Sequence, residues 1–388
     1  MERHAETHTS DLMATTSSLE LTGLVLLAIM VIAGTIQVAY HWFLFSRFAF
    51  GKKQYEKSGL RPVSVIVCAR NESPNLRRFL PVLLDQDHPD YELIVVNDCS
   101  WDDTADVLKE FAPHHPRLKI VTIQEQERYS HGKKFALTLG IKAAKNEHLL
   151  FTDADCWPES RQWISSMTGC FRNDIEIVLG YGGYQKSKGF LNKLIRFDTA
   201  NVAMNYFSFA AAKNAYMGVG RNLAYKKTLF FRNKGFAKHN YLASGDDDLL
   251  VNETATASNV AINPFPEAFT RSLPKTTFSD WFRQKRRHLT TSGHYKTGHK
   301  FHLALIASTA WMFYASLLAL LAMRLELKLT GVVLGSVWLL KLPVFAFSAK
   351  RLMEKDIVPL YPVLEPLHSL LMPFPYIAQA FSKRRAWK

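Results

Sequence analysis

Two aspartates with one residue between them, Asp153 and Asp155, are the residues of this chain best suited to chemistry. They follow an apolar run, residues 149–151, that is typical of the end of a buried strand. Open α/β sheets bind their ligands at the carboxyl edge of the strands, where such a pair would lie. Two carboxylates suit a hard divalent cation, and Mg²⁺ is usually shared with substrate phosphates. The alternative is an ordinary turn whose carboxylates cap the next helix.

Two further acidic sites lie in the same central region. Asp98 comes two residues after the apolar run 91–96, and a triplet, Asp246-Asp247-Asp248, precedes another apolar stretch. Each of these sites alone could be a helix cap, which is the common role of a loop aspartate. Their joint occurrence on one α/β frame, with basic residues further along the chain, favours a shared site.

The elements that must position these residues alternate regularly between strand and helix. The predicted strands are 62–69, 91–96, 118–123 and 149–151, and the predicted helices are 76–84, a helix opening at 102–104, and 135–144. Strands separated by crossover-length helices predict an α/β fold with a mostly parallel, doubly wound sheet. No Gly-x-Gly-x-x-Gly follows the first strand, so an ordinary dinucleotide site is not expected.

Charge and cysteine content narrow the class of partner. The chain has 388 residues and a formal net charge of +14, which indicates an anionic partner. No run of Lys and Arg interleaved with aromatic residues occurs in the middle of the chain, so no nucleic-acid partner is expected. The four cysteines have no zinc-ligand spacing and are interpreted as reduced thiols of a cytosolic domain.

The N-terminal region predicts a membrane anchor. Residues 1–20 form a polar tail that we expect to be disordered. Residues 21–43 carry no formal charge and are long enough to cross a bilayer as a transmembrane helix. Most basic residues near this helix follow it, so the positive-inside rule places the N-terminus outside and the central region in the cytosol. The expected location is the inner (cell) membrane, in a multi-pass arrangement.

The C-terminal region predicts further membrane contact. Residues 303–348 form a transmembrane hairpin, in which Lys341 is expected to snorkel to the headgroups. Residues 357–381 contain five prolines and are interpreted as a re-entrant or interfacial segment, which keeps the basic tail 382–388 in the cytosol. Residues 186–215 alternate apolar and basic residues and form either a membrane-surface helix or an ordinary packing helix.

Six stretches in fixed order resemble the motifs of membrane-bound family 2 glycosyltransferases. That family has the A-type glycosyltransferase fold, a Rossmann-like domain that takes sugars from nucleotide-diphosphate donors. The matching stretches are 62–72, 95–104, 132–137, 151–155, 245–247 and 284–288. Together they span about residues 60–300, which the resemblance therefore identifies as the catalytic domain.

The resemblance implies a donor site with a divalent cation. Six residues are expected to form it: Asn71, Glu72, Asp98, Lys133, Asp153 and Asp155. The first three would hold the nucleoside, with Asp98 meeting the base, and Lys133 would lie near the nucleotide. Asp153 and Asp155 would serve the nucleotide sugar and its metal. The cation is Mg²⁺ or Mn²⁺, because both accept oxygen ligands in octahedral geometry.

The resemblance also implies a catalytic base. Asp247 matches the aspartate that removes a proton from the acceptor hydroxyl, and its two acidic neighbours are expected to raise its pKa. Inversion at the anomeric carbon follows from a single in-line displacement. Four residues are expected near the acceptor and the diphosphate: Asp246, Gln284, Arg287 and His288.

Two departures from the family pattern bear on the product. Asn97 stands where the first of two aspartates is usual, which matters little because the second position contacts the base. His288 stands where processive synthases carry the tryptophan of Gln-x-x-Arg-Trp. We therefore expect transfer of one or a few sugars from a UDP- or GDP-sugar to a lipid or lipid-linked acceptor. The alternatives are a processive polysaccharide synthase subunit and a catalytically silent membrane scaffold.

Overall fold

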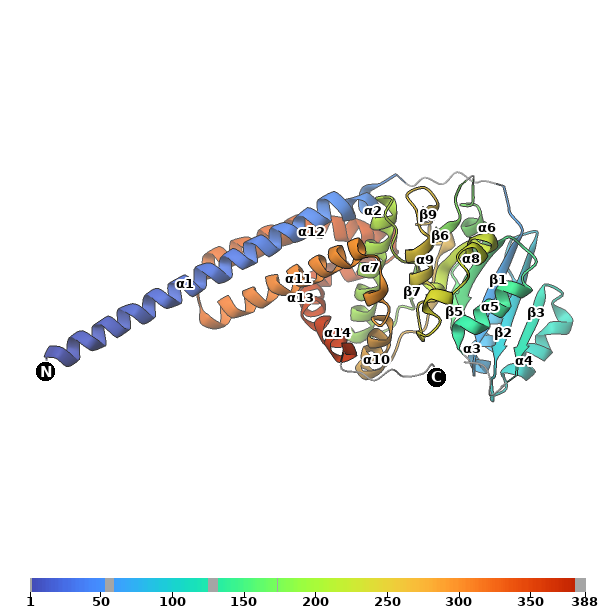
Figure 1. Ribbon diagram of the computed structural model, residues 1–388, viewed down its shortest axis with the longest axis horizontal. Coiled ribbons are helices and arrows are strands. Elements are labelled where there is room, and N and C mark those ends of the chain that lie inside the picture. The colour runs from blue at the N-terminus through green and yellow to red at the C-terminus, as the bar shows by residue number, and fades with distance from the viewer. Residues whose placement is uncertain (1, 53–58, 125–131, 173, 381–388) are drawn as a thin grey trace.

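The computed structural model describes residues 2–52, 59–124, 132–172 and 174–380. An α/β domain forms one end of an elongated molecule, and a bundle of long helices forms the other (Figure 1). A layer of shorter helices lies between them, at the junction of domain and bundle.

The α/β domain is built on a seven-stranded sheet with the order β3-β2-β1-β4-β8-β6-β9. Its strands are β1 (Val63–Ala69), β2 (Tyr91–Asp98), β3 (Leu118–Ile123), β4 (His148–Asp153), β6 (Ile177–Leu179), β8 (Leu223–Lys226) and β9 (Val260–Ile262). The first four strands pair in parallel, whereas β8 is antiparallel to both of its neighbours. The predicted mostly parallel α/β sheet is therefore confirmed.

Helices cover both faces of the sheet, which explains the apolar character of its central strands. The helices of this domain are α3 (Ser73–Leu84), α4 (Thr104–Phe111), α5 (Lys133–Ala143), α6 (Trp163–Thr168), α8 (Lys227–Arg232) and α9 (Asp248–Thr254). Gly140 lets α5 approach the sheet closely, because a Cβ there would lie 2.8 Å from Ile66 and 3.0 Å from Val96. This contact fixes the start of α5, where Lys133 lies, over the carboxyl edge of the sheet.

A second sheet of three short strands adjoins that edge. It has the order β5-β10-β7, formed by β5 (Cys156–Pro158), β10 (Thr270–Ser272) and β7 (Gly182–Tyr184). The sequence analysis did not predict these strands, because three residues carry no recognisable periodicity. Since β5 begins directly after Asp155, this small sheet helps to hold the acidic pair in place.

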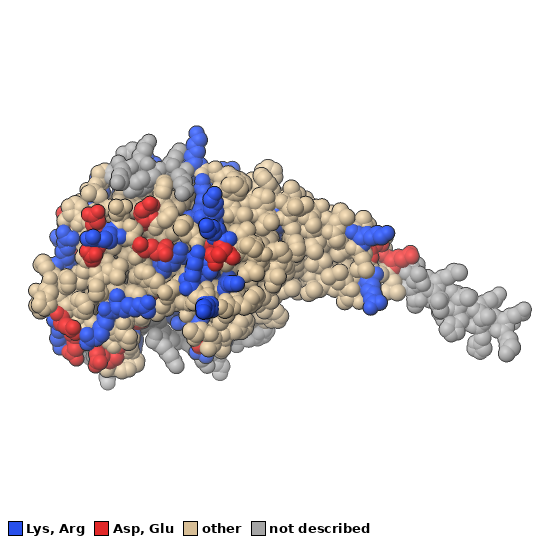
Figure 2. All heavy atoms as spheres, turned by 180° about the vertical axis from the view of Figure 1, so that it is seen from behind, with Lys and Arg blue, Asp and Glu red and all other residues tan. Residues whose placement is uncertain are grey.

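Within the described residues, three helical spans are long and apolar enough to cross a membrane. The first is α1 (Glu2–Tyr40), which continues through a π-helical turn, η1 (His41–Phe45), into α2 (Ser46–Phe50). The others are α11 (Thr297–Met323) and α12 (Leu327–Arg351). The structure continues α1 through the segment expected to be a polar tail, since this helix begins at Glu2. Figure 2 shows few charged atoms along the bundle between the charged α/β domain and a small charged group near its other end.

Four helices connect the domain to the bundle: α7 (Phe190–Ala211), α10 (Phe278–His288), α13 (Tyr361–Leu371) and α14 (Pro373–Ala380). Most of α7 is buried, so it is a packing helix and the membrane-surface interpretation of this segment is wrong. Lys341 does not snorkel: it is buried in α12 and forms an ion pair with Glu365 of α13. The basic tail 382–388 lies outside the described residues.

Candidate active site

The candidate site lies where the strand order changes direction. From β1 the chain adds β2 and β3 on one side and β4 on the other. The crevice at the carboxyl ends of β1 and β4 is therefore the expected ligand site of a doubly wound sheet. Asp153 is the last residue of β4, and the loop 70–72 follows β1 at the same edge.

Asp153, Asp155 and Cys156 form a group whose potential ligand atoms all lie within 4.8 Å of one another. Burial and the charge of Asp153 raise the pKa of Asp155, so a nearby cation would stabilise both carboxylates. The Cys156 thiol donates to Asp155 Oδ1 at 3.3 Å. Burial raises the pKa of this thiol, and the charges of Asp155 and Asp153 raise it further. The thiol thus stays protonated, and the two carboxylates fit a hard divalent cation.

Lys133 joins the acidic pair to the acidic triplet. Its Nζ lies 2.8 Å from Asp153 Oδ1 and 3.0 Å from Asp246 Oδ2. Burial opposes the charge on Lys133, but the two carboxylates hold its pKa well above the ordinary value. The same ion pair outweighs burial and lowers the pKa of Asp153. Two motifs almost a hundred residues apart in sequence therefore meet at one ammonium group.

The three aspartates of the triplet have different surroundings. Asp246 pairs with Lys133, as above. Asp248 accepts hydrogen bonds from Leu249 N (2.8 Å), Tyr295 Oη (2.6 Å) and the Thr291 hydroxyl. Asp247, in contrast, lines the cavity that Lys133 and Asp153 also line. Only the middle carboxylate of the triplet combines access to this cavity with freedom from an ion pair among the described residues.

Asp247 is oriented by two backbone amides. Gly220 N donates to its Oδ2 at 2.6 Å, and Asp248 N donates to its Oδ1 at 2.8 Å. Burial and the neighbouring charges of Asp246 and Asp248 raise the pKa of Asp247 to about 7. A Cβ at residue 220 would lie 3.3 Å from Asp247 Oδ2, so a larger residue there would crowd the carboxylate. These contacts give a fixed carboxylate that can take up a proton near neutral pH.

Arg221 is a site residue to which the sequence analysis gave no role. Its guanidinium lies 4.5 Å from the centroid of the Tyr184 ring and donates to Ser272 Oγ at 3.0 Å. Its positive charge acts to lower the pKa of both Asp153 and Asp155. The only signal in the sequence was its position after Gly220, which does not reveal the contact with Tyr184.

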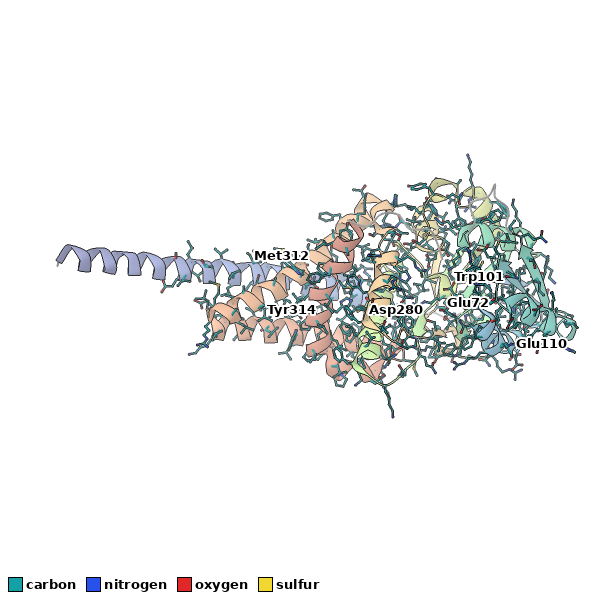
Figure 3. The ribbon with its side chains drawn as sticks, turned by 90° about the horizontal axis from the view of Figure 1, so that it is seen from below. Glu72, Trp101, Glu110, Asp280, Met312 and Tyr314 are labelled. Atoms are coloured by element: carbon teal, nitrogen blue, oxygen red, sulfur yellow. The ribbon has the colours of Figure 1, made fainter. Side chains whose placement is uncertain are left out.

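Helix α10 carries the remaining predicted acceptor residues to the edge of the site. Gln284 accepts a hydrogen bond from Tyr184 Oη at 3.4 Å, and Arg287 acts electrostatically on Asp153. Arg287 and His288 are exposed. On its other side, α10 is anchored by Lys285, whose Nζ lies 2.8 Å from Asp198 of α7. Figure 3 labels Asp280, near the start of α10, between the α/β domain and the bundle.

The predicted nucleoside residues lie on the other side of Asp153, in the loops after β1 and β2. Asn71 N donates to Ser100 Oγ at 2.9 Å, so the two loops are joined. Burial raises the pKa of Glu72, and the charges of Asp155 and Asp153 act in the same direction, which indicates that Glu72 faces the acidic pair. Asp98 is fully buried at the end of β2, and its contact with a base stays a prediction.

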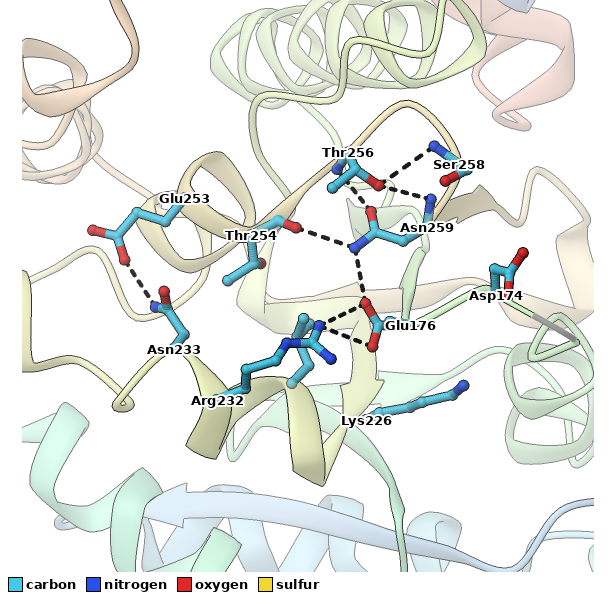
Figure 4. A pocket seen from close by; sticks show the side chains of 11 residues that line it. Asp174, Glu176, Lys226, Arg232, Asn233, Glu253, Thr254, Thr256, Ser258 and Asn259 are labelled. Carbon is cyan, nitrogen blue, oxygen red and sulfur yellow. Dashed lines mark hydrogen bonds and ion pairs between the residues drawn. The ribbon is translucent and has the colours of Figure 1, made fainter.

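A second cavity lies at the opposite edge of the sheet (Figure 4). Lys226, which lines it, pairs with His148 at the start of β4, whereas Asp153 ends that strand. Glu176 in this cavity accepts from Arg232 at 2.8 Å and from Asn259 at 3.1 Å. The cavity is therefore separate from the acidic site by the length of β4.

The fold and the site together define the class of protein. A mostly parallel α/β sheet with an Asp-x-Asp pair at its carboxyl edge is the arrangement of the A-type glycosyltransferase fold. The structure resembles that of the mannosyltransferase PcManGT from Pyrobaculum calidifontis, solved in complex with GDP-Man and Mn²⁺. The TM-score is 0.57 at 20% identity, over 91% of this chain and 99% of the other, which shows a shared fold.

The particular family follows from the sequence comparison. Residues 64–233 match the family model of glycosyl transferase family 2, so the chain carries a domain of that family. The Bacillus subtilis protein named probable glycosyltransferase YdaM is 27% identical over 59% of this chain and 54% of its own length. The poly-beta-1,6-N-acetyl-D-glucosamine synthase of Staphylococcus epidermidis is 31% identical over 30% of this chain and 27% of its own length. The chain thus spans about half or less of the length of these curated relatives.

Proposed function

We propose that this protein is an inverting, metal-dependent glycosyltransferase at the cytosolic face of the membrane. It would move a sugar from a UDP- or GDP-sugar to a lipid or lipid-linked acceptor. The observation that carries the proposal is the joint cavity of Asp153, Lys133 and Asp247, in which the pKa of Asp247 is raised to about 7. A silent scaffold would not need a carboxylate tuned in this way.

Asp153 and Asp155 are the residues that would hold Mg²⁺ or Mn²⁺. A divalent cation there would offset the negative charge of the departing diphosphate, as Lewis-acid metals do. Lys133 supplies a fixed positive charge between the two acidic motifs. Asn71, Glu72 and Asp98 are the expected nucleoside contacts on the side of β1 and β2.

Asp247 is suited to the proton transfer. Its carboxylate would accept the proton of the acceptor hydroxyl as that oxygen attacks the anomeric carbon, and a base with a pKa near the working pH is efficient. The hydrogen bonds from Gly220 and Asp248 hold its orientation. A reaction with retention would need a carboxylate of the enzyme as nucleophile. Asp246 is paired with Lys133 and Asp248 is bound by three donors, so neither is placed to attack the anomeric carbon. A single displacement with inversion is therefore the reaction that this arrangement supports.

The membrane helices and α10 support an acceptor at the bilayer surface. Helix α10, which carries Gln284, Arg287 and His288, lies between the α/β domain and the bundle (Figure 1). The positive charge of Arg287 suits an acceptor with a phosphate group. This position and the three apolar helices favour a lipid or lipid-linked acceptor.

The test uses the full-length protein in detergent with a panel of UDP- and GDP-sugars, Mg²⁺ or Mn²⁺, and membrane lipid extract. We expect one nucleotide to stabilise the protein only with the cation, by about 2.7 kcal/mol at 100 times its dissociation constant. Release of nucleoside diphosphate and a lipid product by mass spectrometry should accompany it. Asp155→Ala should abolish both effects, whereas the exposed control Asp106→Ala should not.

The product distinguishes the alternatives. One sugar or a few on the lipid supports the proposal, and a long ladder of sugars would support a processive synthase. Folded protein that neither binds nor hydrolyses any nucleotide sugar would contradict the proposal and favour a scaffold.

A further inference from the structure

The loop after β2 is joined rigidly to the loop after β1. Trp101 N donates to Asn71 Oδ1 at 2.9 Å, and Glu72 N donates to Thr104 Oγ1 at 2.9 Å. Together with the hydrogen bond from Asn71 N to Ser100 Oγ, these contacts tie the loops at three points. The backbone around Trp101 is therefore fixed relative to the carboxyl edge of β1.

Both loops also contain a residue in the left-handed backbone region. Asn71 has φ of +57° and Cys99 has φ of +51°, and neither is a glycine. Such conformations cost free energy, more so for cysteine than for asparagine, and persist where the surroundings impose them. This strain is located in the two turns that present Trp101, which is a reason to look for a function there.

The Trp101 side chain lies on the surface. Its exposed fraction is 76%, the highest of any large apolar residue of the described α/β domain. The Arg70 guanidinium lies 5.6 Å from the centroid of its ring, within the range of a cation–π contact. Figure 3 shows Trp101 and Glu72 close together at this edge. A flat aromatic ring is thus held at a fixed place with one face supported and most of its surface open.

Where this ring lies relative to the acidic pair follows from the sheet. β2 is two strands away from β4, with β1 between them, and neighbouring strands are about 4.8 Å apart. The end of β2 is therefore roughly 10 Å from the end of β4. A nucleoside diphosphate whose phosphates lie at Asp153 and Asp155 can reach that far with its base.

The direction in which the donor lies follows from Asp247. The reacting sugar must be near Asp247, whose Oδ2 is bound by Gly220 just before β8, on the far side of β4 from β1. Since the diphosphate joins the sugar to the nucleoside, the nucleoside must extend the other way, over β1 toward β2. Trp101 stands at the end of that path.

We propose that Trp101 is the stacking platform for the nucleobase of the donor, with Arg70 supporting the ring from its other face. This inference rests on the proposed function, because it takes a nucleoside diphosphate as the ligand. Stacking on an aromatic ring tolerates any base, since every base has a π-face. Trp101 thereby contributes to the affinity for the nucleoside and leaves the choice between bases to hydrogen-bonding groups nearby.

The test measures the binding of UDP, GDP and pyrophosphate to full-length protein in detergent with Mn²⁺, by calorimetry. Trp101→Ala should weaken binding of the nucleotide that the wild type prefers by about 5- to 150-fold, the range found when a stacking aromatic is removed. Trp101→Phe should retain binding within about threefold, because it keeps a ring. Pyrophosphate has no base, so its affinity should not change. The exposed aromatic Phe231, on α8, gives the control variant Phe231→Ala.

Each other outcome has a definite meaning. Unchanged nucleotide affinity in Trp101→Ala would overturn the inference while leaving the proposed function intact. An equal loss of pyrophosphate affinity would also overturn it, because the substitution would then act through the loop and not through the base. If the wild type bound pyrophosphate but neither UDP nor GDP, the proposed function itself would fail, and this inference with it.

Discussion

Two charged clusters in this molecule differ in their ratio of carboxylates to cations. The active-site cluster has five carboxylates and two cations: Asp153, Asp155, Asp246, Asp247 and Asp248 with Lys133 and Arg221. The junction cluster joins α7, β10 and the chain after α12, and it pairs three cations with three carboxylates: Lys186, Arg196 and Arg271 with Glu159, Glu354 and Asp356.

In the junction cluster, each charge has a partner of opposite sign. Glu354 is fully buried and accepts from Arg196 and Arg271, and from Tyr181 Oη at 3.2 Å. Arg196 also donates to Asp356 at 2.8 Å. This hydrogen bond and a second one, from Lys186, hold the pKa of Asp356 well below its usual range. The cluster is electrically balanced and fixes the chain after α12 to α7 and the α/β domain.

In the active-site cluster, negative charge exceeds positive charge, and the pKa values of Asp155 and Asp247 are raised. A surplus of buried negative charge destabilises a fold unless a cation or a proton joins it. The comparison supports the proposal that the balanced cluster is structural and that the unbalanced cluster binds a cation and a proton.

The largest effect should come from Asp247, the carboxylate proposed to accept the proton. We expect Asp247→Asn to lower kcat by about 10²- to 10⁴-fold, because an amide cannot accept the proton of the acceptor. Donor affinity should change little. In the wild type, activity should rise with pH and level off above about pH 7, because only the deprotonated carboxylate is active. Steady-state rates between pH 5.5 and 8.5 measure both effects.

Stability provides the control for Asp247→Asn. A carboxyl group whose pKa is raised by folding binds its proton more tightly in the folded state, so the folded protein loses stability as pH rises from 3.8, the ordinary pKa, to about 7, and the loss levels off above that. Asparagine does not ionise, and the variant should therefore unfold at pH 8 at a temperature at least as high as the wild type. A large loss of stability would show that Asp247 is structural and would break the comparison.

The second largest effect should come from the junction cluster, as a loss in the free energy of unfolding. Glu354→Gln leaves Arg196 and Arg271 without their shared buried carboxylate, and we expect a loss of about 3 kcal/mol in the free energy of unfolding. Asp356→Asn should cost less, because Asp356 is 44% exposed and water screens its pairs. Thermal unfolding in detergent measures both. If Glu354→Gln instead lowered kcat in protein of normal stability, the junction would be part of the catalytic machinery.

The sequence predicted the parts of this site that depend on local pattern. Continuous apolar runs predicted β1 to β4, and an aspartate two residues after such a run lies at the edge of the sheet, as Asp153 does. The parallel frame then brings β1, β2 and β4 together without further information. The resemblance to family 2 enzymes added the role expected of Asp247.

Other features depended on contacts between distant residues. Nothing in the triplet itself distinguishes Asp247 from Asp248, because the distinction comes from Thr291 and Tyr295, more than forty residues away. Likewise, the apolar and basic pattern of α7 does not reveal that Glu354 and Asp356 will neutralise Arg196. Local pattern therefore located the site, and tertiary contacts decided the role of each residue within it.

The smallest effect should come from the cavity at the opposite edge of the sheet, which also contains paired charges. Arg232 and Glu176 are 2.8 Å apart, but the Arg232 side chain is 61% exposed. We expect Arg232→Gln to change the free energy of unfolding by less than about 1 kcal/mol, the usual range for a surface pair. Activity should be unchanged, because the length of β4 separates this pair from Asp153. Arg232→Gln and Glu354→Gln should be measured side by side, because the first affects an exposed ion pair and the second affects a buried one. The difference between them gives the effect of burial on an ion pair. A loss as large as that of Glu354→Gln would mean that balance alone, without burial, makes an ion cluster structurally important.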